Sequence, residues 1–343
     1  MARNLDLPSR ALTVTRYREL RKHVRGFAQG NTDLLIIVGD GGIGKSRTVK
    51  KTMDSVCGKG AWGLLKGRHS ALDFYGALFA HRTRPVVLDD LDGLLRIPEN
   101  VALMKAVCET EAIKTLEWGS TSPALVKHDP PLPPRFDSTS QICLVANDLK
   151  TSNRDHAALF DRGIVLHFQP TAVEVHRQVA SGRWFDDEEV FGFIGRHLHL
   201  VDGPSFRLYK HALSLKATGV DWRRDALKMM SGEADPKLLL VARLLDDASY
   251  DARPKPEEAR VKAFQRQGGG SRATYFRRKE ALLERRDSFN LDQVARIRLK
   301  PRRSACEDRA TLALHRELEA PGEPQGAGSR APQRLQDSGE SVA

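Results

Sequence analysis

A glycine-rich run that ends in a lysine and a serine stands directly after a short apolar segment, Leu34–Val38. The run Gly39-Asp-Gly-Gly-Ile-Gly-Lys-Ser46 fits the pattern G-x-x-x-x-G-K-[ST], and the residues after it read as a helix. Glycines let backbone N–H groups curl around phosphates at the positive end of a helix. The sequence therefore predicts a phosphate-binding loop, whose contacting residues are Gly39, Gly41, Gly42, Ile43, Gly44, Lys45, Ser46 and Arg47.

The polar side chains of this loop and of a second segment suit a nucleoside triphosphate with Mg²⁺. Lys45 would neutralise the β- and γ-phosphates, and the Ser46 hydroxyl would ligate Mg²⁺. The apolar segment Val86–Leu88 is followed by two carboxylates. Asp89 would hold Mg²⁺ through water, and Asp90 would orient and polarise an attacking water. The expected cofactors are ATP and Mg²⁺.

A third apolar segment, Ile142–Ala146, is followed by Asn147, whose amide could bond both the attacking water and the γ-phosphate. Continuous apolar runs are typical of strands buried on both faces, and helical patterns lie between them. The sequence therefore predicts an α/β fold with a parallel sheet and helices on both faces. Apolar spacing also predicts a helix over residues 11–30, and helical patterns alone from Pro170 to about Gly232.

The order of these motifs resembles that of the AAA+ P-loop ATPases over roughly residues 11–230. The segments 114–125, 133–149 and 153–176 are similar to AAA+ ATPases carried by phages, plasmids and mobile elements. The resemblance implies a helical lid domain and an ATP-dependent homo-oligomer. It also implies that Arg162, or alternatively Arg154, reaches the γ-phosphate of a neighbouring subunit, and that Arg207 is a second sensor in the lid.

The resemblance leaves two functions open. One is a helper ATPase in replication, transposition or partition of mobile DNA, with a further protein partner. The other follows from Gly-Gly-Ile-Gly-Lys with Val-Leu-Asp-Asp, which is also similar to signalling ATPases of the STAND type. Such a protein would be a transcriptional regulator that holds ATP with little turnover. Asp90 and Arg162 discriminate the two, because only a motor or timer needs both.

The net charge of +11 is concentrated near the C-terminus. Residues 253–303 contain sixteen lysines and arginines against six acidic residues, which accounts for +10 of the total. A nearly neutral body with one basic segment indicates a polyanionic partner. In this segment residues 256–267 read as a helix, Gly268–Gly270 as a turn, and Ser271 as the cap of a second helix.

This basic segment resembles the helix-turn-helix of site-specific recombinases and transposon proteins. In such a motif the second helix reads base edges, while its arginines and lysines hold phosphates. The expected partner is duplex DNA, with RNA or another polyanion as the alternative. Ala273, Phe276 and Leu283 are predicted to face inward. The predicted DNA contacts are Arg272, Thr274, Tyr275, Arg278 and Lys279.

The chain of 343 residues allows about two domains and a smaller module. We expect a nucleotide-binding domain over 1–169, a helical lid over 170–235, a basic module over 236–304 and a disordered tail over 319–343. The apolar runs are shorter than the about 20 residues of a membrane span, and no secretory signal is visible. Four cysteines without C-x-x-C pairing are typical of a reducing compartment, so the expected location is the cytoplasm.

Overall fold

A computed structural model describes residues 7–90, 93–119, 123–148, 154–201, 203, 205–231, 235–287, 289 and 291–300. These residues belong to one compact unit, Met1–Lys300. The predicted tail, 319–343, lies outside the described residues. The strands are β1 (Leu12–Val14), β2 (Leu34–Val38), β3 (Gly63–Lys66), β4 (Val86–Asp89), β5 (Lys114–Glu117), β6 (Arg135–Ser138), β7 (Ile142–Ala146) and β8 (Ile164–Phe168).

Six of these strands form one parallel sheet in the order β1-β8-β2-β7-β4-β3, and β5 and β6 form a separate antiparallel pair. The helices that precede or interleave with the strands are α1 (Tyr17–Ala28), α2 (Lys45–Val56), α3 (Ala71–Ala80), α4 (Pro98–Val107), α5 (Pro123–Lys127) and α6 (Arg154–Asp161), with a 3₁₀ turn η1 at Leu94–Arg96. Because the strands are parallel, their carboxyl ends meet at one edge of the sheet.

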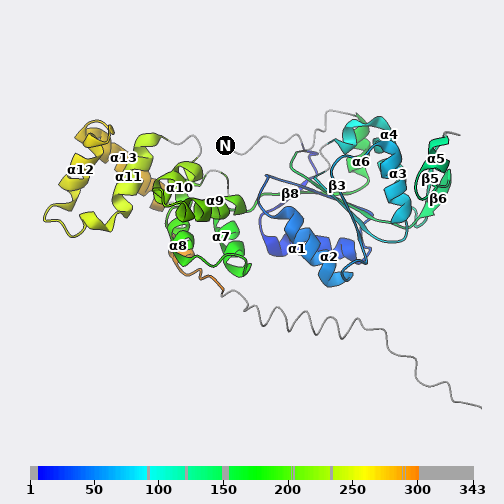
Figure 1. Cartoon of the computed structure of the whole chain (residues 1–343), viewed down its shortest axis with the longest axis horizontal. Helices are drawn as coiled ribbons and strands as arrows, with labels where there is room; N and C mark the ends of the chain where they lie inside the picture. Colours follow the sequence, from blue (N-terminus) through cyan, green and yellow to red (C-terminus); the bar gives the residue numbers. More distant parts are fainter. Residues whose placement is uncertain are drawn as a thin grey trace, which may run out of the picture. The chain divides into compact units, whose positions relative to one another are not determined.

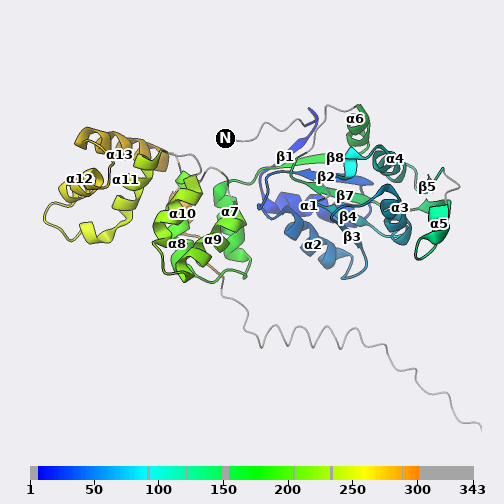
Figure 2. The same cartoon turned by 45° about the horizontal axis from the view of Figure 1, so that its top comes forward.

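Alternate residues of the strands point into two apolar cores. Leu35 and Ile37 of β2 pack on the face covered by α1 and α2, whereas Leu34 and Ile36 pack on the face covered by α3, α4 and α6 (Figures 1 and 2). The predicted parallel sheet with helices on both faces is therefore confirmed.

The predicted helix over residues 11–30 is only partly correct. Residues Leu12–Val14 form β1, which pairs with β8, and the helix begins at Tyr17. Leu12 is half exposed, so it contributes little to the apolar stripe of the helix. The backbone of β8 needs hydrogen-bond partners on its outer side, and β1 supplies them.

The described elements after Phe168 are all helical. They are α7 (Ala172–Ser181), α8 (Glu188–Arg196), η2 (Leu198–Leu200), α9 (Phe206–Ala217), α10 (Trp222–Ser231), α11 (Pro236–Asp246), η3 (Ala248–Tyr250), α12 (Pro256–Arg266), α13 (Arg272–Asp287) and α14 (Leu291–Ala295). Their apolar side chains share one core with the α1 face of the sheet. The backbone N–H of Lys300 donates to the carbonyl of Ala180 at 3.0 Å, which ties the last described residues to α7. None of the described helices is long and apolar enough to cross a membrane.

The stability of this helical region is expected to fall in mild acid because of His176. Its ring is buried, stacks on Phe191 at 3.9 Å and shares a 2.8 Å hydrogen bond with the Tyr209 hydroxyl. Burial lowers the pKa of His176 to about 3. Between that value and the ordinary pKa near 6.5, the unfolded chain binds the proton and the folded chain does not, so stability decreases as the pH falls. Urea unfolding should give about 2 kcal/mol less stability at pH 5 than at pH 6.5 from this group.

The matched control for this prediction is His176→Gln, which keeps a polar side chain at the position but cannot titrate. The variant should lose most of that pH dependence. An equal pH dependence in the variant and the natural protein would show that other groups cause it.

Candidate nucleotide site

The predicted phosphate loop connects β2 to α2 at the carboxyl edge of the sheet. Gly42 and Gly44 have φ angles of 83° and 81°, which side chains rarely tolerate, and Gly44 caps the start of α2. Lys45 is buried, and its Nζ donates to the carbonyls of Gly39 at 2.6 Å and of Asp40 at 2.8 Å. Burial lowers the pKa of Lys45 to about 8, although nearby carboxylates oppose that shift.

Asn147 links the lysine of the loop to the second aspartate. It accepts from Lys45 Nζ at 3.0 Å through Oδ1, and its Nδ2 donates to Asp90 Oδ1 at 3.1 Å. The strand order explains this link, because β7 lies between β2 and β4. Asp90 has a φ of 62°, a left-handed conformation that aspartate tolerates better than most residues. Three side chains that are far apart in the sequence thus form one hydrogen-bonded chain.

The first aspartate of β4 lies beside the serine of the loop. Ser46 Oγ donates to Asp89 Oδ1 at 2.5 Å, and the ammonium groups of Lys50 and Lys66 lie 2.9 Å and 3.2 Å from Oδ2. Burial by itself raises the pKa of Asp89, but the hydrogen bonds from Lys50 and Ser46 outweigh it and hold that pKa below its usual value. A hydroxyl and an ionised carboxylate are the oxygen donors that Mg²⁺ prefers, so these two residues fit a magnesium site.

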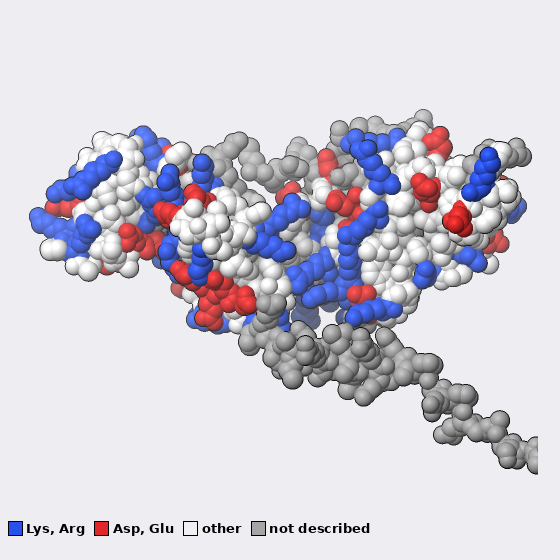
Figure 3. Space-filling model, in the orientation of Figure 1, with Lys and Arg blue, Asp and Glu red and all other residues white. Residues whose placement is uncertain are grey.

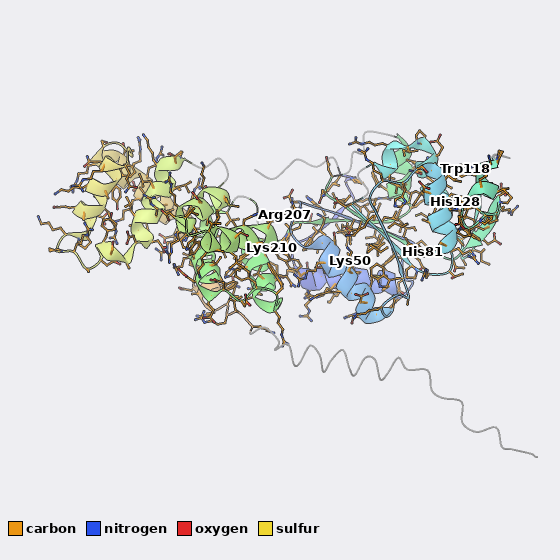
Figure 4. All side chains as sticks on the ribbon, in the orientation of Figure 1. Lys50, His81, Trp118, His128, Arg207 and Lys210 are labelled. Atoms are coloured by element: carbon orange, nitrogen blue, oxygen red, sulfur yellow. The ribbon has the colours of Figure 1, made fainter. Side chains whose placement is uncertain are left out.

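The start of α9 packs directly on the phosphate loop. The backbone N–H of Phe206 donates to the Gly42 carbonyl at 2.9 Å. A Cβ at Gly42 would collide with Ser205 Oγ, and one at Gly44 would collide with the ring of Phe206. Figure 4 labels Arg207 at this place, where its Nη1 lies 3.7 Å from the position of a Cβ on Gly41. Close packing therefore also requires glycines in the loop.

The predicted nucleotide contact Arg47 has an aromatic partner. Its guanidinium lies 5.4 Å from the ring centroid of Trp184, and the Lys210 ammonium lies 5.9 Å from the same ring. Tyr17 stacks on Phe206 at 6.1 Å and donates to the Ile43 carbonyl at 2.5 Å. Lysines and arginines gather on this part of the surface, near the labelled Lys50, Arg207 and Lys210 (Figures 3 and 4).

Arg162 lies away from this group of residues. It is exposed, it follows α6, and its Nη1 donates to the Ala158 carbonyl at 2.9 Å. The next residue, Gly163, approaches Leu34 at the start of β2, whereas the phosphate loop follows the end of that strand. A five-residue strand spans roughly 15 Å, so Arg162 is on the opposite edge of the sheet. The side chain of the alternative residue, Arg154, lies outside the described part of the chain.

The structure thus brings together six of the predicted site residues: Lys45, Ser46, Asp89, Asp90, Asn147 and Arg207. Sequence reasoning missed Lys50 and Lys66. The spacing offered a signal for Lys50, because it follows Ser46 by four residues and so shares its face of a helix. No comparable signal marked Lys66, which reaches Asp89 from the neighbouring strand β3.

At the C-terminus, α12 and α13 are joined by the predicted glycine turn. Thr274 N–H donates to Ser271 Oγ at 3.2 Å, as expected of a cap. The Thr274 hydroxyl lies 3.1 Å from Ser271 Oγ, so it is engaged within the turn. Arg272 is exposed at the first position of α13, with its guanidinium 5.3 Å from the ring centroid of Phe276.

Arg272 is exposed as predicted, but most of the predicted inward and outward positions of α13 are wrong. Tyr275 is fully buried against Phe264 with ring centroids 5.5 Å apart, whereas Phe276 is 38% exposed. Further along the helix, Leu282 rather than Leu283 is the buried leucine. The reason is that α12 presents Phe264 to α13, and this ring selects Tyr275 rather than its neighbour.

Two other predicted DNA contacts are engaged within the chain. Arg278 pairs with Asp235 at 2.6 Å, and Lys279 pairs with Glu257 at 2.7 Å. Both basic side chains are partly buried. The exposed positions between residues 272 and 280 of α13 are Arg272, Ala273, Phe276, Arg277 and Glu280.

No family model matches the sequence, and no curated protein matches it. Among solved structures, the chain is similar to domain III of the replication initiation protein DnaA from Thermotoga maritima, with 13% identity and a TM-score of 0.39 over 67% of this chain and 95% of that one. It is also similar to the Bacillus subtilis DNA clamp loader delta protein (YqeN), with 10% identity and a TM-score of 0.29 over 90% of this chain and 95% of that one. A third similar structure is C. elegans PCH-2, with 12% identity and a TM-score of 0.35 over 63% of this chain and 66% of that one. Similarity at this level says nothing of the function, which has to be inferred from the geometry of the site.

Proposed function

We propose that the protein is an AAA+ ATPase that binds ATP with Mg²⁺ and hydrolyses it. The observation that carries this proposal is the hydrogen-bonded chain from Lys45 through Asn147 to Asp90. It joins a cation suited to the β- and γ-phosphates to a carboxylate suited to an attacking water. Ser46 Oγ and Asp89 Oδ1, which lie 2.5 Å apart, would hold Mg²⁺ beside this chain of hydrogen bonds.

Each residue then has a defined role in hydrolysis. Asp90 accepts a hydrogen bond from the attacking water and orients it, and Asn147 fixes that carboxylate and contacts the γ-phosphate. Arg207 approaches the phosphate loop from α9, so it would couple the helical region to the bound nucleotide. Mg²⁺, when bound, neutralises charge that develops on the phosphates.

The position of Arg162 supports an oligomer. It is exposed on the edge of the sheet opposite to the phosphate loop, so it is suited to the nucleotide of a second copy of the chain rather than to its own. ATP bound between copies would then hold the oligomer together. An arginine supplied in this way stabilises charge in the transition state.

The exposed face of α13 supports duplex DNA as the partner. Arg272 and Arg277 are exposed there, and the segment 253–303 contains +10 of the net charge. Arginines on an exposed helix can hold phosphates or read guanine edges. The proposed role is that of a helper ATPase in replication, transposition or partition of mobile DNA, with a further protein partner.

A second function, a regulator that holds ATP with little turnover, is favoured by the two lysines on Asp89. The experiment that separates the two is the rate of ATP hydrolysis at several protein concentrations, with and without duplex DNA. An oligomeric helper ATPase should show a rate per chain that rises with protein concentration and responds to DNA. Bound ATP without turnover in either condition would favour the regulator. A rate per chain that is independent of concentration and DNA would contradict the oligomer.

A further inference from the structure

The carboxylate of Asp89 has both of its oxygens engaged by donors of this chain. Ser46 Oγ donates a hydrogen bond to Oδ1 at 2.5 Å, while the ammonium groups of Lys50 and Lys66 lie 2.9 Å and 3.2 Å from Oδ2. The Asp89 side chain is only 3% exposed, so this is a buried charge rather than a surface pair. We call Lys50 and Lys66 on Asp89 the lysine clasp.

The clasp is built from two elements that converge on the carboxylate. Lys50 lies on α2, one helical turn after Ser46, and is 27% exposed. Lys66 is the last residue of β3, paired in register with Asp89 of β4, and is 54% exposed. Both positions are therefore fixed by regular structure and not by a loop. Two ammonium groups on one oxygen also repel each other, so a second negative group nearby would be favourable.

The charges around the phosphate loop do not balance without a ligand. Five basic residues lie in or around the loop and three acidic residues face them. The basic ones are Lys45, Arg47, Lys50, Lys66 and Arg207, and the acidic ones are Asp40, Asp89 and Asp90. ATP without metal has a charge near −4, and Mg²⁺ would offset two of those charges. The lysine clasp has the same charge as Mg²⁺, and it is held at the residue predicted to hold Mg²⁺.

We propose that the lysine clasp supplies the positive charge for which other sites need a divalent cation, so that nucleotide binds here with or without Mg²⁺. Mg²⁺ with its water shell then enters only by displacing ammonium groups from Asp89. The inference rests on the proposed nucleotide binding. Nucleotide binding and hydrolysis then have different requirements. Binding needs no metal, whereas hydrolysis requires Mg²⁺ to displace the ammonium groups of the lysine clasp from Asp89.

The experiment measures the affinity of the full-length protein for a fluorescent ADP in excess EDTA and in saturating Mg²⁺. The natural protein should show affinities within about threefold of each other. Lys50→Met and Lys66→Met should each lose about tenfold in EDTA and much less in Mg²⁺. Each single variant keeps one ammonium on Asp89, so the fold should persist, and a thermal melt checks this. The control is Lys51→Met with Lys59→Met, which removes two exposed lysines near the same helix.

A second measurement follows the displacement of the clasp directly. Mg²⁺ is titrated into protein that already holds the fluorescent ADP, and Lys50→Met should reach half-saturation at a lower Mg²⁺ concentration than the natural protein. Lys50→Arg, which keeps the charge, should behave as the natural protein does. A natural protein that binds ADP only with Mg²⁺, or lysine variants that match the control in EDTA, would overturn the inference. Absence of ADP binding in both conditions would instead overturn the proposed function.

Discussion

Arg162→Ala should lower ATP hydrolysis by about 10³-fold while the affinity for ATP stays unchanged, because a transition-state arginine supplied from another subunit has an effect of that order. The side chain is exposed and donates a hydrogen bond to the Ala158 carbonyl one helical turn earlier, so its loss should not disturb the fold. Steady-state turnover and equilibrium binding of labelled ATP check the two halves of this prediction.

A mixing experiment tests whether Arg162 acts between subunits. Lys45→Ala protein cannot bind ATP but still offers Arg162, and Arg162→Ala protein binds ATP but lacks the arginine. A mixture of the two inactive variants should recover part of the activity. If no mixing ratio recovers activity, and the protein sediments as a monomer in the presence of ATP, the proposed oligomer would be contradicted.

Charge reversal on the exposed face of α13 should have the largest effect on DNA binding. Arg272→Glu with Arg277→Glu removes two groups available to phosphates. Each phosphate contact contributes about 0.9 to the slope of log affinity against log salt, so the slope should fall by about two and the affinity roughly 30-fold at about 0.15 M salt. Fluorescence anisotropy with a labelled duplex over a salt series measures both quantities.

The control for the charge reversal is Arg18→Glu with Arg25→Glu, which changes the net charge equally on exposed positions of α1. Point variants suit this test better than truncation before Arg253, because Phe264 and Tyr275 belong to the same core as the apolar residues of α7 to α10. Equal losses in both double variants would show a general charge effect and no binding face on α13.

The parts of the fold that could be predicted correctly are those in which the residues of a single segment are enough to indicate its secondary structure. The segments 34–38 and 142–146 are continuous apolar runs because both faces of these strands are covered, and they form β2 and β7 with the same limits. The strands β1 and β3 are short and partly exposed, so their residues show no such run. Their existence depends on pairing with β8 and β4, which is decided by the rest of the sheet.

The same distinction applies to the functional side chains. Lys45 could be predicted because the glycine-rich pattern around it lies within one segment. Asp90 and Asn147 could be predicted because each directly follows an apolar run that forms a strand. The exposed face of α13 could not, because Tyr275 and Phe276 are adjacent aromatic residues and only packing against Phe264 decides between them. When contact with another element decides whether a residue is buried or exposed, the sequence of its own segment does not show which it will be.

The most direct test of the proposed hydrolysis is to identify the nucleotide that remains bound after labelled ATP is incubated with Mg²⁺ and with the natural protein, Lys45→Ala or Asp90→Asn. Lys45→Ala should retain no nucleotide, because the β- and γ-phosphates lose the buried cation of the loop. Asp90→Asn should retain ATP, because Ser46 and Asp89 still hold Mg²⁺ while the attacking water loses its acceptor. The natural protein should release ADP. Undiminished binding by Lys45→Ala, or full turnover by Asp90→Asn, would contradict the assignment of this site.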